Sequence, residues 1–210
     1  MALLFVTRPY TKENKRRAVQ ELVNDALPDR DFYLLLIGAA FLAVCGIFTD
    51  SIPVLIASMI VAPLASPILA LGLGIVSRDG RLIARSFGTL LISMILVPGF
   101  ALLLTALIGH VQTDRVFISF ASDPLVATLI ALVAGAIAAY GLVRIKVGGA
   151  MTGIGIAVSL MPPLAASGLA VAAHDAVLFQ ETSILFGLNV IGILVGSIVV
   201  FALFRLDKNR

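Results

Sequence analysis

Two pairs of prolines stand inside long apolar runs of this 210-residue sequence, where a helix-breaking residue has a chemical consequence. Pro63 and Pro67 lie in "IVAPLASPIL", and Pro162 and Pro163 lie in "SLMPPLAASG". Because proline has no backbone N–H, a continuous helix would leave the carbonyl four residues earlier without its donor. The affected carbonyls are those of Met59, Pro63, Val158 and Ser159. Such carbonyls are tolerated deep in a membrane when neighbouring protein satisfies them or when they line a water-filled cavity.

Uncharged polar side chains accompany these prolines. The polar residues near the middle of the apolar runs are Ser58, Ser66, Thr89, Ser93, Ser159, Ser167, Asn189 and Ser197. Carriers that couple to protons, and voltage sensors, usually carry ionisable residues at this depth, and here there are none. The pattern therefore favours a site for a neutral solute, or for an ion held by backbone groups. Asn189 either contacts the solute or bonds to a neighbouring helix.

Catalytic and metal-binding patterns are absent from the sequence. It contains no His-Glu-x-x-His and no Gly-x-Ser-x-Gly, and His174-Asp175 is an isolated pair. Acid–base and nucleophilic catalysis need such groups within reach of one another. We therefore expect no enzymatic activity, no metal and no cofactor.

The composition assigns the chain to the membrane proteins. Hydrophobic residues make up 60% of it and charged residues 13%, against about 25% charged residues in soluble domains. Basic residues outnumber acidic ones by a net charge of +3, but they form no stripe with interleaved aromatics. We therefore expect the lipid bilayer as a partner and exclude nucleic acid.

Six apolar segments are long enough to cross a bilayer as helices. They are residues 32–49, 52–77, 82–109, 124–143, 147–173 and 183–204. Strands of a membrane barrel would alternate in polarity, and these segments do not. The sequence thus predicts an all-α protein with a transmembrane domain over 32–204.

The basic residues predict the orientation. If residue 1 is cytoplasmic, fourteen of the fifteen Lys and Arg residues fall on that side and only Arg115 falls on the other. This asymmetry predicts a multi-pass protein of the inner cell membrane with both termini in the cytoplasm. Residues 1–31 then form a cytoplasmic segment and 205–210 a cytoplasmic tail. Within the first, 13–28 predict an amphipathic helix, either interfacial or a soluble linker.

An internal repeat relates the two halves of the predicted domain. With a shift of one hundred residues, "IASMIVAPLASPILAL" aligns with "IAVSLMPPLAASGLAV", and Pro63 aligns with Pro163. The halves, 32–109 and 124–204, then hold three spans each, so they must be inverted across the membrane. Inverted repeats with interrupted helices indicate a midplane binding site in transporters. An ordinary proline kink is the alternative.

The turn "SRDG" predicts a cytoplasmic connection between two spans. Arg78 and Asp79 either gate an inner mouth or form an ordinary solvated turn. Small-residue pairs such as Gly192 and Gly196 suit close helix packing, so we also expect a homo-oligomer.

Three segments carry a family resemblance: "SMIVAPLASPILALGLGIVSRDGRL", "GIAVSLMPPLAASGLAV" and "LFGLNVIGILVGSIVVFALF". In this order they resemble the prokaryotic membrane proteins catalogued as domain of unknown function 389. The likeness covers roughly residues 32–204. The family pattern falls on Pro63, Pro67, Asp79, Pro162, Pro163 and Asn189, with Leu188 where relatives often have Thr. The resemblance implies a multi-pass cell-membrane protein, in a form without the soluble regions of many relatives, and implies no activity.

Two functions remain open at this point. The first is a channel or transporter for a small neutral solute or ion, with a pathway at the interrupted second and fifth spans. The second is a non-transporting scaffold or sensor whose prolines only shape helix packing.

Overall fold

The computed structural model describes residues 19–20, 22–24, 26, 28–109, 123–143 and 160–204. Every helix whose bounds the structure gives is an α-helix, and the described residues contain no strand. These helices are α2 (Arg30–Phe48), α3 (Ile52–Val61), α4 (Ala65–Ser77), α5 (Gly80–Ile108), α7 (Pro124–Val143), α9 (Met161–Ala172) and α10 (Ala176–Leu203). The predicted all-α class is confirmed for this part of the chain.

Four of these helices, α2, α5, α7 and α10, are long and apolar enough to cross a membrane. The pair α3 and α4 adds a fifth crossing if it is one span bent by 47°. The segment predicted over 147–173 lies partly outside the described residues, which contain only its second part, the short helix α9. The chain is thus a multi-pass membrane protein by the length and composition of its helices.

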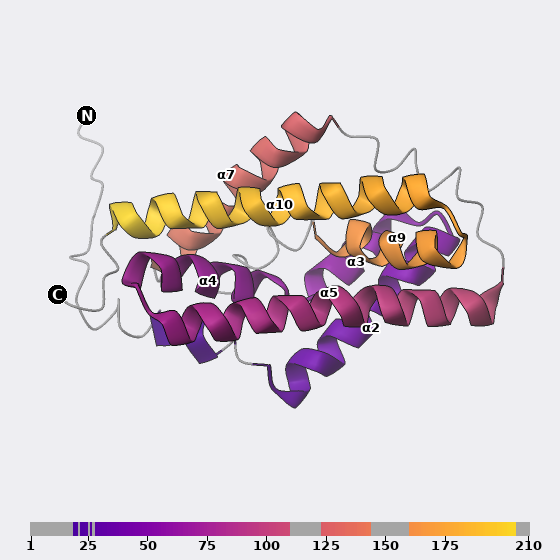
Figure 1. Cartoon of the computed structure of the whole chain (residues 1–210), viewed down its shortest axis with the longest axis horizontal. Helices are drawn as coiled ribbons and strands as arrows, with labels where there is room; N and C mark the ends of the chain where they lie inside the picture. Colours follow the sequence, from indigo (N-terminus) through magenta and orange to yellow (C-terminus); the bar gives the residue numbers. More distant parts are fainter. Residues whose placement is uncertain are drawn as a thin grey trace, which may run out of the picture.

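The long helices α5 and α10 run in opposite directions along the molecule, and so do the short helices α4 and α9 (Figure 1). Both short helices begin near the middle of the long axis. The turn from α4 to α5 lies at one end of the molecule, and the turn from α9 to α10 lies at the other. Each short helix contacts both long ones.

Glycines let α7 approach α10 closely. A Cβ added at Gly135 would meet the backbone of Ile193, and one added at Gly196 would meet the carbonyl oxygen of Leu132. Small residues at a helix crossing allow such contact, which in lipid replaces the hydrophobic effect as a source of association. The sequence prediction of close packing at Gly192 and Gly196 is met within the chain, between these two helices.

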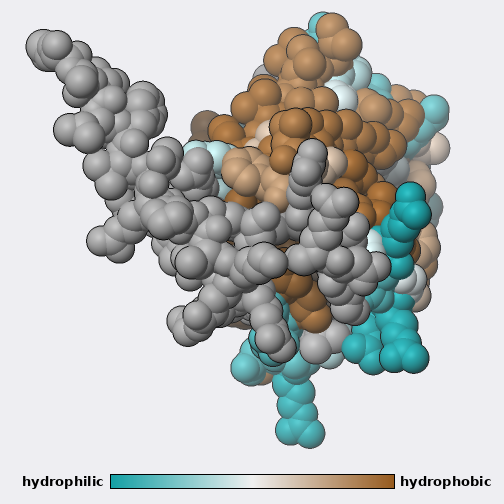
Figure 2. All heavy atoms as spheres, turned by 90° about the vertical axis from the view of Figure 1, so that its left-hand side faces the viewer, coloured by the Kyte–Doolittle hydropathy of each residue, from teal (hydrophilic) through white to brown (hydrophobic). Residues whose placement is uncertain are grey.

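Apolar side chains cover much of the outer surface of the bundle. Leu107, Leu203 and Ile95 are each more than 70% exposed, far beyond the exposure that a water-soluble surface tolerates over many residues. Figure 2 views the molecule from the end where α4 turns into α5, with hydrophobic residues in the upper part of the view and hydrophilic residues mainly below and at the right edge. The surface therefore has the distribution expected of a protein surrounded by lipid.

The described residues of the predicted amphipathic segment contact the bundle. Leu22 and Ala26 are buried in the main core cluster, with Val19 packed against it, whereas Gln20 and Asn24 are exposed. The apolar face of this segment is therefore covered by protein, because the bundle offers it an apolar surface.

Candidate functional site at the helix breaks

The chain leaves helical geometry between α3 and α4, at the first of the predicted breaks. Helix α3 ends at Val61, Ala62 is extended (ψ 124°), and α4 begins at Ala65. Pro63 lies in this connection, as expected of a residue that cannot continue a helix. The predicted helix break at Pro63 is confirmed, and α3 and α4 form either one broken span or a re-entrant loop.

Pro67 has a different role from the one predicted for it. It occupies the third position of α4, where a backbone N–H would have no intrahelical acceptor. Proline there removes no bond from the helix. The same holds for Pro162 and Pro163, which stand at the second and third positions of α9. These three prolines therefore begin helices.

The predicted site residues before α9 cannot be placed. Val158 and Ser159 lie outside the described residues, and the structure begins again at Leu160, which caps the helix. The predicted interruption of the fifth span therefore falls at the edge of the described residues and stays a prediction.

Backbone carbonyls gather at the end of α3. The amide of Ala62 donates to the carbonyl of Ser58 at 3.1 Å, the last backbone bond of this helix. Within the part of the chain that the structure describes, no backbone amide outside the helices donates to the carbonyls of Met59, Ile60 or Val61. As predicted, the proline at position 63 denies Met59 its usual donor.

The hydroxyl groups of the predicted pathway bond to their own helices. Ser58 donates to the carbonyl of Leu55 at 2.6 Å, and Ser167 donates to that of Leu164 at 2.7 Å. Such bonds satisfy a hydroxyl hydrogen in an apolar environment and leave oxygen lone pairs as acceptors. Ser66 is partly buried in the first turn of α4, and Asn189 is buried on α10.

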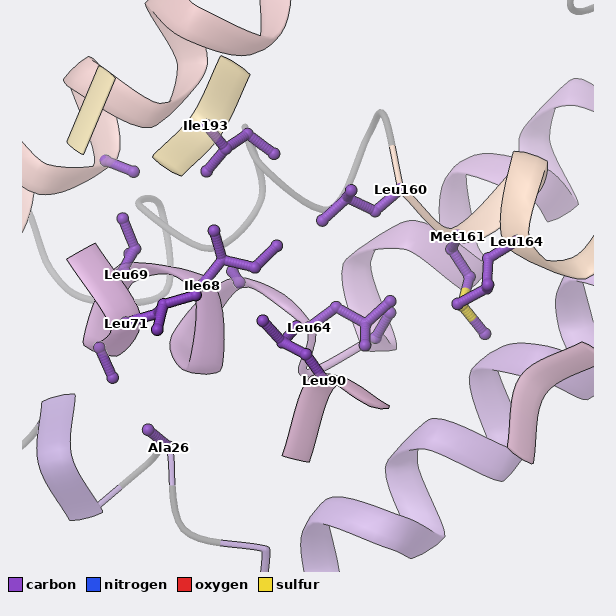
Figure 3. Packing of buried hydrophobic residues seen from close by; sticks show 14 of the residues in the cluster. Ala26, Leu64, Ile68, Leu69, Leu71, Leu90, Leu160, Met161, Leu164 and Ile193 are labelled. Carbon is purple, nitrogen blue, oxygen red and sulfur yellow. The ribbon is translucent and has the colours of Figure 1, made fainter. Parts of the chain in front are cut away.

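The ends of α3, α4 and α9 share one apolar core. Leu64, Leu160, Met161 and Leu164 are all buried members of the same cluster (Figure 3), and α3 contacts α9 directly. The structure therefore places α9, which begins with Met161, Pro162 and Pro163, in contact with α3, the helix that ends two residues before Pro63.

Arg78 and Asp79 lie far from these breaks, at the end of the molecule where α4 turns into α5. Arg78 has a left-handed backbone (φ 54°). The Asp79 Oδ1 atom accepts hydrogen bonds from the amides of Arg81 (3.1 Å) and Leu82 (3.3 Å). Asp79 is thus the N-cap of α5, which accounts for an acidic residue at this position.

The same turn occurs again between α9 and α10. His174 is left-handed (φ 56°), and the Asp175 Oδ1 atom accepts from the amides of Val177 (3.1 Å) and Leu178 (3.0 Å). The backbone bonds also correspond, since Asp79 donates to Gly74 and Asp175 donates to Ala170, each at 2.9 Å. Asp79 and Asp175 are 96 residues apart, not one hundred.

A separation of 96 residues relates more than this turn. It pairs Leu64 with Leu160, which precede α4 and α9, and Pro67 with Pro163 in their first turns. Buried residues of α5 also fall on buried residues of α10. These pairs are Ser86 with Thr182, Leu90 with Phe186, Ser93 with Asn189, Val97 with Ile193, Ala101 with Ser197, and Thr105 with Phe201. The shift of one hundred residues does not describe these helices.

Two close contacts follow the same relation. A Cβ added at Gly72 of α4 would meet the Ser197 hydroxyl of α10, and one added at Gly168 of α9 would meet Pro98 and Ala101 of α5. Gly168 lies 96 residues after Gly72, and Ser197 lies 96 residues after Ala101. The paired glycines and aspartates were the sequence signal for this register. Alanine and leucine matches at one hundred obscured it.

Comparison with known proteins gives one family and one relative. The family model described as "Domain of unknown function (DUF389)" matches residues 59–195. An uncharacterized protein of Methanocaldococcus jannaschii is 32% identical over 213 residues, which cover 95% of this chain and 63% of the relative. The chain thus spans less than two thirds of that protein's length. No solved structure matches the chain.

Proposed function

We propose that this chain, which belongs to the DUF389 family, is a channel or transporter for a small solute or ion. The pathway would pass the point where α3 ends and α4 and α9 begin. The observation that carries the proposal is the 47° break between α3 and α4, a helix pair that together is long and apolar enough to cross a membrane, with the start of α9 in the same core. Irregular backbone at membrane depth is tolerated where it is buried in protein or lines a water-filled cavity.

The proposal includes two inverted repeats of three spans each. It is supported by the 96-residue relation between the α4–α5 and α9–α10 units, with their matching caps and glycine contacts. It is also supported by the opposite directions of these units (Figure 1). The remaining crossing would be completed by residues before Leu160, and the broken fifth span would then mirror the second.

The remaining features of the proposal rest on the sequence. The distribution of basic residues supports an inner-membrane protein with both termini in the cytoplasm and the turn at Arg78 and Asp79 on that side. We also propose a homo-oligomer and a non-enzymatic role, with Ser58, Met59, Pro63, Ser66, Pro67, Val158, Ser159, Pro162, Pro163, Ser167 and Asn189 along the pathway.

Solute flux tests the proposal directly. The purified full chain is reconstituted into proteoliposomes, and uptake is measured for cations, anions and neutral solutes against empty vesicles. We expect at least one solute to cross faster through the protein. Folded protein without flux for any member of the panel contradicts the transport function.

A membrane scaffold or sensor is the second candidate. It is favoured by the density of packing at the breaks, where Leu64, Leu160 and Met161 are almost fully buried. A single-cysteine chain separates the two functions: Ser66→Cys is introduced into a Cys45→Ala background and treated with a small hydrophilic thiol reagent. Labelling supports a water-accessible pathway, whereas protection of folded protein supports the scaffold.

A further inference from the structure

We infer that the break between α3 and α4 binds a small monovalent cation through backbone carbonyl oxygens. This inference rests on the proposed function and names the class of solute that its pathway would take. It does not follow from transport alone, because uncharged polar groups along a pathway equally admit neutral solutes and anions.

Acceptors are concentrated where α3 ends. The carbonyls of Met59, Ile60 and Val61 receive no hydrogen bond from any backbone amide outside the helices of the described chain. Helix carbonyls point toward the C-terminal end of their helix. These three oxygens are therefore directed into the break, where Pro63 offers no N–H.

Protein covers one side of this part of the backbone, whereas the Ile60 side chain is 53% exposed on the other. Met59 and Val61 pack against the main core cluster, and Ala62 and Leu64 are buried in it. Lipid cannot solvate a carbonyl, and an unsatisfied polar group buried in an apolar environment costs about 1–3 kcal/mol by mutational measurements. Within the described part of the chain these oxygens have no backbone donor outside the helices, and a dehydrated cation would supply a partner, as it does at unwound helices in transporters.

Donors for an anion are few at the same place. Pro67 in α4 and both Pro162 and Pro163 in α9 remove amides from the first turns of these helices. The positive end of a helix consists of such amides, so its attraction for anions is weakened. The Ser58 and Ser167 hydroxyls already donate to carbonyls of their own helices.

Formal charge sets the valence of the ion. Helices α3, α4 and α9 contain no Lys or Arg that would hold an anion, and no Asp or Glu that would neutralise a divalent cation. Divalent ions in proteins are usually bound with the help of carboxylates. Neutral carbonyls, in contrast, are sufficient for Na⁺, K⁺ or Rb⁺.

Ion binding and ion flux are measured separately on the full chain. Thermal unfolding in detergent is compared in chloride salts of Na⁺, K⁺, Rb⁺ and N-methylglucamine at equal ionic strength. Uptake of labelled Rb⁺ and Na⁺ into proteoliposomes is compared with uptake of chloride, formate and glycerol. We expect alkali ions alone to raise the unfolding temperature, and alkali ions to cross at least about tenfold faster than the others, a ratio that one well-placed ligand set can supply.

Variants at Pro63 test whether the carbonyls at the end of α3 cause the alkali-ion flux and the ion-dependent rise in unfolding temperature. Pro63→Ala and Pro63→Gly each add an amide that can bond to the Met59 carbonyl, and glycine does so without favouring a straight helix. We expect both to lower alkali-ion flux and to abolish the ion-dependent rise in unfolding temperature. Pro53→Ala is the matched control, because Pro53 is exposed in the first turn of α3, at the other end of that helix.

The outcomes separate this inference from the proposed function. Flux of an anion or of glycerol without alkali-ion flux overturns the cation site and leaves transport standing. Absence of all flux from folded protein overturns both. Unchanged alkali-ion flux in Pro63→Gly overturns the assignment to the carbonyls, since the added amide would then have no effect.

Discussion

At the scale of single residues, three helix ends adopt a backbone that usually requires glycine. Asp50, Arg78 and His174 have φ of 49°, 54° and 56°, and each lies between the end of one helix and the N-cap residue of the next. An L-residue in this region carries a steric cost that glycine lacks. The chain retains side chains there, and at Arg78 the charge also belongs to the basic residues expected at the cytoplasmic side.

Glycine at Arg78 or His174 is expected to stabilise the protein. Arg78→Gly and His174→Gly remove the contact between Cβ and the backbone, and we expect each to raise the free energy of unfolding by about 0.5–1 kcal/mol. Arg81→Gly is the control: Arg81 lies in the first turn of α5, where glycine costs up to about 1 kcal/mol. Thermal unfolding in detergent measures the stability of all three variants. A loss of stability in both Arg78→Gly and His174→Gly would contradict a steric cost of the left-handed backbone at these positions.

The caps of α5 and α10 are expected to be equivalent. Asp79→Ala and Asp175→Ala each remove an oxygen that accepts two amide bonds, and we expect each to cost about 1 kcal/mol. Asp79→Ser and Asp175→Ser keep an acceptor and are expected to restore most of the loss. Hydrogen exchange at the first turn of each long helix reports the effect locally. Equal stability of the Ala and Ser variants would mean that capping is not their role.

At the scale of elements, the two short helices are held by glycine contacts of different kinds. Gly72 faces a hydroxyl that can be removed, whereas Gly168 faces the backbone of Pro98 as well as a side chain. Overpacking at such a site typically costs about 1–3 kcal/mol. The α4–α10 interface at Gly72 can therefore accommodate a larger residue when one side chain is shortened, whereas the α9–α5 interface at Gly168 cannot.

This difference predicts a selective rescue. Gly72→Ala is expected to lower stability, because the added methyl group would meet the Ser197 Oγ atom. The further change Ser197→Ala is expected to recover stability, because the Ser197 Cβ atom lies 3.5 Å from the added carbon. Gly168→Ala is expected to lower stability without recovery by Ala101→Gly, since the Pro98 carbonyl remains. Gly187→Ala, with open space around it, is the control. The unfolding temperature of each variant is measured. Recovery of Gly168→Ala by Ala101→Gly would contradict the contact with the Pro98 backbone.

The sequence predicted apolar spans better than it predicted helix ends. The segment 124–143 coincides with α7, and 32–49 lies within two residues of α2. Helix α10, however, begins at Ala176 and not at 183, because the Asp175 cap sets its start and the exposed Gln180 and Glu181 extend it beyond the apolar run. Hydropathy detects the part of a helix that lies in lipid, whereas caps decide where the helix begins.

Of the candidate site, the break at Pro63 could be predicted, and the start of a helix at the other prolines could not. Proline occurs both at helix breaks and in the first turn of helices, and the two cases differ in where the preceding backbone turns. The 96-residue relation between the α4–α5 and α9–α10 units was missed for a related reason. In apolar segments alanine and leucine recur by composition, so the few positions with steric or capping roles, such as Gly72 and Asp79, carry the relation.

At the scale of the whole molecule, the two helical units are related by opposite directions and a common register. The α4–α5 turn and the α9–α10 turn lie at opposite ends of the bundle (Figure 1). If the long axis of the bundle crosses the membrane, these turns emerge on opposite sides. The proposed inversion of the repeats therefore has a direct topological consequence.

Labelling from one side of the membrane tests this topology. In a Cys45→Ala background, Arg81→Cys and Val177→Cys place single thiols at exposed positions just after the two turns. With intact cells and a membrane-impermeant maleimide, we expect only the thiol at position 177 to react, and lysis to expose the one at position 81. Reaction of both in intact cells, or of neither, contradicts the proposed orientation.

Neither short helix can cross a membrane alone, and this constrains the order of biogenesis. At 12 and 13 residues, α9 and α4 reach about 20 Å, short of the roughly 30 Å of hydrocarbon. Helix α4 contacts α10 as well as α5, yet α10 is the last of these helices to leave the ribosome. After the first half of the protein has been synthesised, α4 therefore lacks its contact with α10 until the second half is made.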